Sequence, residues 1–252
     1  MLVIRRLLFV ALCCLGACAR EQEAELTVFA ATSLRDAFTT LGESWKAAHP
    51  GVALTFNFAG TQELRTQLEQ GATADVFASA DQRHMTELVK AGRVSTPELF
   101  ARNEPVIVVA KEAATSIRAW SDLRGAKRLV IGAPDVPIGR YTLQILDKAG
   151  ADFRAELESK IVSRELNVRQ VLNKVKLGEA DVGFVYRTDA LSAPELTVIT
   201  IPAELNAIAE YPIAVAANAP HPKLAEAWLA LVRSQEGRGA LERAGFLLPR
   251  AP

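Results

Sequence analysis

The feature that most constrains the fold of this chain is a unit of buried strand, small residues with a hydroxyl group, and helix, which occurs twice near its start. The first copy lies in Leu26–Phe38, where an apolar run typical of a parallel strand buried on both faces leads to Ser33. Asp36 follows three residues later, which predicts a capping box and a helix start. The second copy begins with a strand at Val52–Phe58 and reaches Thr61 before the next helix. Repeated units of this kind predict an open α/β fold, in which ligands bind beyond the carboxyl ends of the strands.

The rest of the chain continues the alternation but is predicted to cross between two sheets. A third strand is predicted at Ala74–Ser79, and the β-branched segment Val106–Lys111 would carry the chain into a second sheet. The segment Ile213–Ala217 would cross between the sheets again, ahead of two C-terminal helices. Two crossings predict two lobes with a cleft between them, one of residues 24–103 plus 214–252 and the other of residues 104–213.

The N-terminal segment is predicted to be a secretory signal, because two arginines precede an apolar stretch, Leu7–Leu15, that is too short to span a bilayer. The segment Leu15-Gly16-Ala17-Cys18 resembles a bacterial lipobox. It predicts a signal peptide of residues 1–17, a lipid attached to Cys18, and a polar tether of residues 18–23. The alternative is that Ala17-Cys18-Ala19 is a cleavage site of the A-x-A type, which would release a soluble protein beginning at Arg20.

The charge balance argues against a nucleic-acid partner. The chain has 29 basic and 29 acidic residues, with no block of like charge. Removal of residues 1–17 takes away two arginines and no acid, so the mature chain carries a formal charge of −2. An anionic ligand must therefore be held by local donors rather than attracted by overall charge. Cys13 and Cys14 leave with the signal, so no disulfide is expected.

Five positions at helix starts or strand ends are candidate sites for neutral hydrogen-bond donors. They are Ser33, Thr61, Ile138, Val168 and Tyr186. Each has a plain structural alternative: Ser33 and Thr61 can be helix caps, Ile138 and Val168 helix-entry residues, and Tyr186 an ordinary half-buried tyrosine. Together they suit a fully deprotonated dianion, which can only accept hydrogen bonds. An acidic side chain in the site would instead select a protonated anion such as phosphate, and Asp135 and Glu165 lie near in sequence.

The chain resembles the periplasmic molybdate-binding proteins of ABC importers across nearly all of residues 25–250. The resemblance rests on four ordered motifs, Val28–Leu34, Gly71–Asp81, Val136–Tyr141, and Asn167–Val171 with Gly183–Ala190. It implies a type II periplasmic binding protein fold, with a mixed, mostly parallel sheet flanked by helices in each lobe and a tetrahedral oxyanion in the cleft.

The same resemblance assigns roles to the five candidates. It implies that hydroxyl groups of Ser33 and Thr61, backbone N–H groups of Ile138 and Val168, and the Tyr186 hydroxyl hold the oxygens of molybdate or tungstate, with the metal bound only through its oxygens. Two residues depart from the family's pattern. A serine is common at the position of Thr61, which keeps the hydroxyl, and an alanine at that of Ile138, which would act through its backbone.

The resemblance implies an extracytoplasmic, periplasmic receptor, expected to be a monomer, that passes molybdate, and tungstate with it, to an ABC permease in the inner membrane. The lipobox adds the expectation that Cys18 anchors it to a membrane. No cofactor is expected. Closure is predicted to hinge near residues 103–106 and 211–214.

Three other functions stay open. A different tetrahedral oxyanion such as sulfate could be the ligand, or a small organic molecule could bind, with Arg140 and Asp135 flanking the site. An enzyme is disfavoured, since the sequence has no Gly-x-Ser-x-Gly, P-loop or His-Glu-x-x-His motif. The three histidines, His49, His84 and His221, are expected at the surface.

Overall fold

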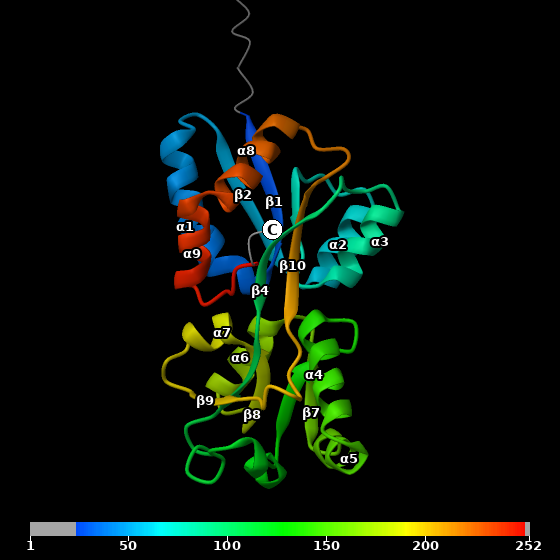
Figure 1. Cartoon of the computed structure of the whole chain (residues 1–252), viewed down its shortest axis with the longest axis vertical. Coiled ribbons are helices and arrows are strands. Elements are labelled where there is room, and N and C mark those ends of the chain that lie inside the picture. The colour runs from blue at the N-terminus through cyan, green and yellow to red at the C-terminus, as the bar shows by residue number, and fades with distance from the viewer. Residues whose placement is uncertain (1–23, 250–252) are drawn as a thin grey trace, which may run out of the picture.

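Two five-stranded sheets form two lobes that are stacked along the long axis of the protein (Figure 1). The computed structural model describes residues 24–249. The predicted signal peptide, the tether and Cys18 lie outside the described residues. Within residues 24–249, no helix has the length and apolar character needed to cross a membrane.

The first sheet has the strand order β2-β1-β3-β10-β4. Its strands are β1 (Glu25–Ala31), β2 (Ala53–Ala59), β3 (Val76–Ala78), β4 (Glu98–Asn103) and β10 (Ala209–Val215). β1 is parallel to β2 and β3, whereas β10 is antiparallel to β3 and β4. Helices α1 (Arg35–Ala48), α8 (Pro222–Arg233) and α9 (Gln235–Arg243) cover one face, and α2 (Thr61–Glu69) and α3 (Gln82–Lys90) cover the other (Figure 1).

The second sheet has the order β7-β6-β8-β5-β9. Its strands are β5 (Pro105–Val109), β6 (Leu129–Gly132), β7 (Ile161–Glu165), β8 (Val182–Tyr186) and β9 (Thr197–Thr200). β6 is parallel to β7 and β8, and β5 is antiparallel to β8 and β9. The helices of this lobe are α4 (Pro137–Lys148), α5 (Ala151–Glu158), α6 (Val168–Lys176) and α7 (Arg187–Leu191), and two 3-10 helices, η1 (Thr32–Leu34) in the first lobe and η2 (Trp120–Gly125) in the second, complete the fold.

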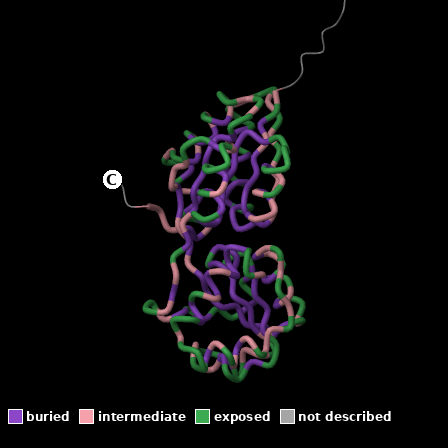
Figure 2. Tube along the Cα trace, turned by 90° about the vertical axis from the view of Figure 1, so that its right-hand side faces the viewer, coloured by how far each residue is buried: buried purple, intermediate pink, exposed green. Residues whose placement is uncertain are grey.

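An aromatic cluster fixes α1 and α8 against the first sheet. The rings of Trp45 and Phe38 lie 5.7 Å and 5.4 Å from the Trp228 ring, and all three side chains are fully buried. Burial of each such side chain contributes about 1.5–3 kcal/mol. Because α1 follows β1 directly through η1, this packing also fixes the junction that carries Ser33. Figure 2 shows buried residues through the centre of each lobe, with exposed residues mainly on the outer surfaces.

The predicted α/β fold with two mixed sheets flanked by helices is confirmed, with half of the strand pairings in each sheet parallel. One boundary differs from the prediction. β10 starts at Ala209, so residues 209–213 belong to the first sheet rather than to the second lobe. Pro212 lies inside this strand, where the register with β4 shifts between Tyr211 and Pro212. The exact division into lobes stays a prediction.

Candidate functional site

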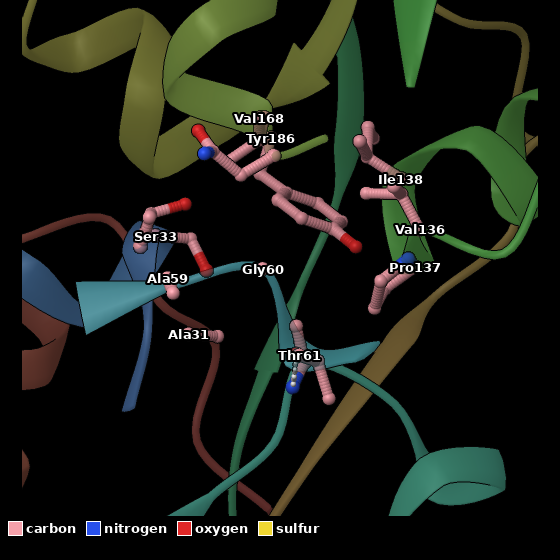
Figure 3. Close-up of a pocket in the computed structure, with 13 residues that line it drawn as sticks. Ala31, Ser33, Ala59, Gly60, Thr61, Val136, Pro137, Ile138, Val168 and Tyr186 are labelled. Carbon is pink, nitrogen blue, oxygen red and sulfur yellow. Dashed lines mark hydrogen bonds between the residues drawn. The ribbon is translucent and has the colours of Figure 1, made fainter. Parts of the chain in front are cut away.

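A cavity lies between the two lobes and is lined by residues from both (Figure 3). The first lobe contributes the ends of β1 and β2, the start of α2 and Ala80; the second contributes the starts of α4 and α6 and the end of β8. The structure brings all five predicted residues to this cavity, namely Ser33, Thr61, Ile138, Val168 and Tyr186. None of the described residues that line it is charged. Each of the five predicted residues is at most 4% exposed, so their donor groups are shielded from water.

Ser33 lies in η1, where the chain turns from β1 into α1. Its hydroxyl does not cap either helix, which corrects the predicted capping box with Asp36. The residue at the N-cap of α1 is Leu34, and the Ser33 oxygen instead lies 2.9 Å from the Tyr211 hydroxyl. The Ser33 hydroxyl is therefore hydrogen-bonded to Tyr211 of β10 and not to the backbone of the helix that it precedes.

Thr61 is the first residue of α2, after the N-cap residue Gly60. Its oxygen accepts a hydrogen bond of 3.1 Å from the backbone N–H of Ala80. Because a hydroxyl can accept and donate at once, the Thr61 proton stays free to donate toward the cavity. Thr61 is thus not a side-chain cap of α2, and its structural partner is the Ala80 N–H.

Ile138 and Val168 place backbone N–H groups at the cavity. Ile138 is the second residue of α4, after Pro137, and Val168 is the first residue of α6. The N–H groups of a first helical turn have no partner within the helix, and they lie at the positive end of its dipole. Asn167 caps α6 through the N–H of Gln170 at 3.1 Å, so the cap does not occupy the N–H of Val168, which lines the cavity. Two helix starts therefore offer neutral donors to an anion.

Tyr186 ends β8 and reaches across the cavity from the second lobe. In Figure 3 its hydroxyl points into the space bordered by Gly60, Thr61 and the turn at Val136 and Pro137. This buried hydroxyl oxygen has no hydrogen-bond partner among the described residues. Burial raises the pKa of Tyr186 well above its ordinary value, so the hydroxyl keeps its proton and can donate. An unpaired buried hydroxyl is costly, which makes it a strong indication of a ligand.

Ion pairs cross between the lobes just outside the cavity. Arg140 Nη2 lies 3.0 Å from Asp81 Oδ2, and Arg169 Nη2 lies 2.6 Å from Asp36 Oδ2. A third pair joins Arg83 to Asp135 at 3.0 Å. We call these six residues the charged rim, and each lies within three residues of the cavity lining in sequence: Asp36, Asp81, Arg83, Asp135, Arg140 and Arg169.

A buried carboxylate supports the rim from within the second lobe. Asp189 is fully buried, and its Oδ1 lies 2.7 Å from Arg169 Nε. Burial raises the pKa of Asp189 to about 6, although the Arg169 guanidinium opposes this shift. Arg169 therefore stands between one buried carboxylate in its own lobe and one half-exposed carboxylate, Asp36, in the other.

The main chain of the first lobe approaches that of the second lobe closely at Gly60. The side-chain amide of Gln62 donates to the Leu166 carbonyl oxygen of the other lobe at 2.7 Å. A Cβ atom built on Gly60 would lie 2.3 Å from that same carbonyl oxygen. No residue other than glycine fits this contact without moving the lobes apart.

The residues considered for an organic ligand do not line the cavity. Arg140 binds Asp81 and Asp135 binds Arg83, so both are used in the charged rim. His84 is fully buried rather than at the surface, and its Nε2 lies 2.8 Å from the Asp135 carbonyl oxygen. Within residues 24–249, no group of three or more histidine, cysteine, aspartate or glutamate side chains could hold a metal ion. The chemistry available in the cavity is hydrogen-bond donation.

Several residues at the site were not anticipated from the sequence. Tyr211 and Asn103 were considered only as parts of the two predicted hinges, yet they form a hydrogen-bonded pair behind Ser33. Asp81 and Arg169 stood inside quoted motifs without a role. The available signal was their position beside lining residues, since Asp81 follows Ala80 and Arg169 follows Val168.

Residues 26–247 match the family described as bacterial extracellular solute-binding protein. The chain is 44% identical over 227 residues to the molybdate-binding protein ModA of Mycobacterium tuberculosis strain H37Rv. That match covers 89% of this chain and 85% of the relative.

Two solved structures share the fold. The periplasmic molybdate-binding protein of Azotobacter vinelandii gives a TM-score of 0.80 at 21% identity, covering 89% of this chain and 100% of that one. The sulfate-binding protein SubI from Mycobacterium tuberculosis H37Rv gives 0.81 at 20% identity, covering 90% and 88%. The predicted likeness to periplasmic binding proteins is thus confirmed. The two scores also show that the fold alone does not separate one oxyanion from another.

Proposed function

The chain belongs to the bacterial extracellular solute-binding proteins and, within them, to the ModA family, and from this membership we propose that it captures molybdate outside the cytoplasm and delivers it to an ABC importer. The proposal includes five contact residues, Ser33, Thr61, Ile138, Val168 and Tyr186. Identity to ModA of Mycobacterium tuberculosis supports molybdate rather than sulfate, because it is higher than that to the sulfate-binding structure of the same fold.

The observation that carries the proposal is the unpaired, buried hydroxyl of Tyr186, in a cavity whose other hydrogen-bond donors are neutral as well. Molybdate is a fully deprotonated dianion near neutral pH, so every oxygen accepts hydrogen bonds and none donates. A buried carboxylate would repel it, and a buried arginine would need full pairing to avoid a desolvation cost. Neutral hydroxyls and helix N–H groups avoid both problems.

We extend the proposal to tungstate, which has nearly the size and the charge of molybdate. Sulfate is smaller, so a cavity of fixed dimensions would stretch its hydrogen bonds. A site made of donors alone also disfavours a protonated oxyanion such as hydrogen phosphate, because its proton would meet another donor proton. Discrimination is therefore expected between molybdate and these two anions, and hardly at all between molybdate and tungstate.

The remaining parts of the proposal concern how the receptor works. Residues 24–103 with 209–252 and residues 104–208 act as lobes that close on the anion, bending where the chain crosses between the sheets, near residues 103–106 and just before β10. The closed monomer then docks on a permease in the inner membrane. It needs no cofactor and performs no catalysis, and the cross-lobe contacts of the charged rim support a closed form.

We also propose that Cys18 carries a lipid that holds the mature, periplasmic protein at a membrane. The sequence Leu15-Gly16-Ala17-Cys18 supports this. The test is a detergent phase separation of the protein from its native host, with its mass. An aqueous-phase protein that begins at Arg20 and carries no acyl chains would refute the anchor and leave molybdate binding untouched.

The ligand is tested by calorimetric titration of purified residues 20–252 with molybdate, tungstate, sulfate and phosphate. We expect tight binding of the first two and weak or absent binding of the others. Molybdate at one hundred times its dissociation constant should stabilise the fold by about 2.7 kcal/mol. An unchanged melting temperature with molybdate would refute the proposed function, and preferential binding of sulfate would reassign it.

A further inference from the structure

A buried chain of hydrogen bonds leads from the crossing between the lobes to Ser33. Asn103 ends β4, and its Nδ2 lies 2.9 Å from Thr188 Oγ1 and 3.4 Å from the Tyr211 hydroxyl oxygen. The Tyr211 hydroxyl in turn lies 2.9 Å from Ser33 Oγ. All four side chains are buried, so water does not compete for these bonds.

The donor and acceptor roles along this series of hydrogen bonds are fixed at the Asn103 end. The backbone N–H of Glu104 can only donate, and it donates to Asn103 Oδ1 at 2.9 Å. The other end of the Asn103 amide is therefore the NH2 group, which also only donates. Tyr211 must accept from Asn103, so its single proton points to Ser33. Burial raises the pKa of Tyr211 well above its ordinary value, so the phenol keeps that proton.

Ser33 is consequently the acceptor in its bond with Tyr211, and its own proton is free to point into the cavity. Thr61 reaches the same state by a shorter route, because the N–H of Ala80 can only donate to its oxygen. The Ser33 and Thr61 hydroxyls are thus both held as acceptors toward the protein and as donors toward the cavity.

We propose that Asn103 and Tyr211 are positioning residues that force the Ser33 hydroxyl to donate, and that they thereby help the site select fully deprotonated oxyanions. This inference rests on the proposed function. Without the chain, the Ser33 hydroxyl could turn and accept a proton from a ligand such as hydrogen phosphate. With the chain in place, that proton would find no acceptor at Ser33.

The first test is the variant Tyr211→Phe, which removes the hydroxyl and keeps the ring that packs on Phe246 and Tyr186. Loss of one hydrogen bond that orients Ser33 should weaken molybdate binding about 2- to 12-fold. In a Ser33→Ala background the same change should have no further effect. Tyr141→Phe is the matched control, because it removes the hydroxyl of another buried tyrosine, which lies beside Tyr186 but is not part of the hydrogen-bond chain from Asn103 to Ser33. Its molybdate affinity should stay within about twofold of the wild-type value.

The second test is Asn103→Asp, which replaces the NH2 group by an oxygen that accepts. The Tyr211 proton should then turn toward residue 103 and draw the Ser33 proton after it, so that Ser33 presents lone pairs to the anion. We expect a loss of molybdate affinity larger than that of Tyr211→Phe. The part due to reversal should disappear in the Ser33→Ala background, whereas the through-space effect of the added charge should remain.

Selectivity separates positioning from a merely structural role. In Tyr211→Phe, the ratio of molybdate to phosphate affinity at pH 6 should narrow, because phosphate is protonated there and the Ser33 hydroxyl is free to turn. Equal effects of Tyr211→Phe with and without Ser33, or an unchanged ratio, would overturn the inference while leaving the proposed function intact. A wild-type protein that binds neither molybdate nor tungstate would overturn both.

Discussion

The cavity and the charged rim lie side by side, yet the cavity is lined by neutral donors and the rim is built from ion pairs. Arg169 directly follows Val168, and Arg140 lies two residues after Ile138, yet neither guanidinium group lines the cavity. The difference separates two tasks. The rim pairs align the lobes, and the exposed pair Arg83–Asp135 does so at little net energy, whereas shielded neutral donors hold the anion.

The largest expected effect comes from placing a charge in the cavity. Thr61→Asp puts a carboxylate where the anion binds and can still accept the Ala80 N–H bond, so the fold should be kept. Two unit charges 4 Å apart repel by about 4 kcal/mol at an effective dielectric constant of 20, and molybdate carries two, so calorimetry should show molybdate affinity reduced by at least about 1,000-fold. Thr61→Ser keeps the hydroxyl and should stay within about threefold. A tenfold loss or less in Thr61→Asp would contradict the neutral-donor site.

Next in size is Tyr186→Phe, which removes the unpaired hydroxyl. Loss of a hydrogen bond to a charged ligand should weaken molybdate binding about 10- to 150-fold. The ligand-free protein should become more stable by about 1–3 kcal/mol in urea unfolding, because a buried polar group without a protein partner is gone. Tyr211→Phe is the contrast, since its hydroxyl is paired with Ser33 and its loss should lower stability. Destabilisation by Tyr186→Phe would mean that its hydroxyl has a partner in the protein.

Breaking one ion pair of the rim should matter much less. Asp36→Asn removes the cross-lobe partner of Arg169, and the Asp36 side chain is 49% exposed. Such a pair contributes about 0.2–1 kcal/mol, so molybdate affinity should fall by no more than about fivefold, and the difference should shrink at high salt. Asp147→Asn breaks a pair within the second lobe, with Arg154, and should leave affinity unchanged. A salt-independent loss of a hundredfold in Asp36→Asn would place the rim among the main determinants of binding.

The smallest effect is a pH dependence of stability from Asp189. The folded protein keeps this proton up to a pKa of about 6, whereas the unfolded chain releases it near the ordinary value of 3.8. Between these values the folded state binds more protons, so the free energy of unfolding should fall as the pH rises from about 4 to about 6. Asp189→Asn should remove this slope in urea unfolding series. A slope of the opposite sign that vanishes in Asp189→Asn would show that Arg169 outweighs burial.

The sequence predicted the cavity better than its surroundings. Ser33, Thr61, Ile138, Val168 and Tyr186 follow strand ends or begin helices, and such positions gather at the carboxyl ends of the parallel strands of each sheet, where the two lobes face each other across the cavity. This convergence depends on local strand–helix order, which sequence patterns carry well. Whether all five residues bind the ligand stays a prediction.

The partners behind and around these residues depend on long-range contacts that no local pattern encodes. Ser33 meets Tyr211 across 178 positions of the chain, and Asn103 meets Thr188 across 85. The helix cap predicted for Ser33 was wrong because this distant hydroxyl took the place of the local N–H group. The short strands β4 and β9 were missed because their residues do not show a continuous apolar run.

The contact between Gly60 and Leu166 has a mechanical consequence. The main chain of Gly60 lies close to the Leu166 carbonyl oxygen there, beside the Gln62 amide that donates to it, so the contact limits how far the lobes can close. The lobes cannot be drawn further together by a ligand that is too small. A sulfate ion would therefore keep long hydrogen bonds instead of tightening the cavity around itself. The main chain therefore sets the distance between the lobes across the cavity, and substitutions on the outer surface should leave that distance unchanged.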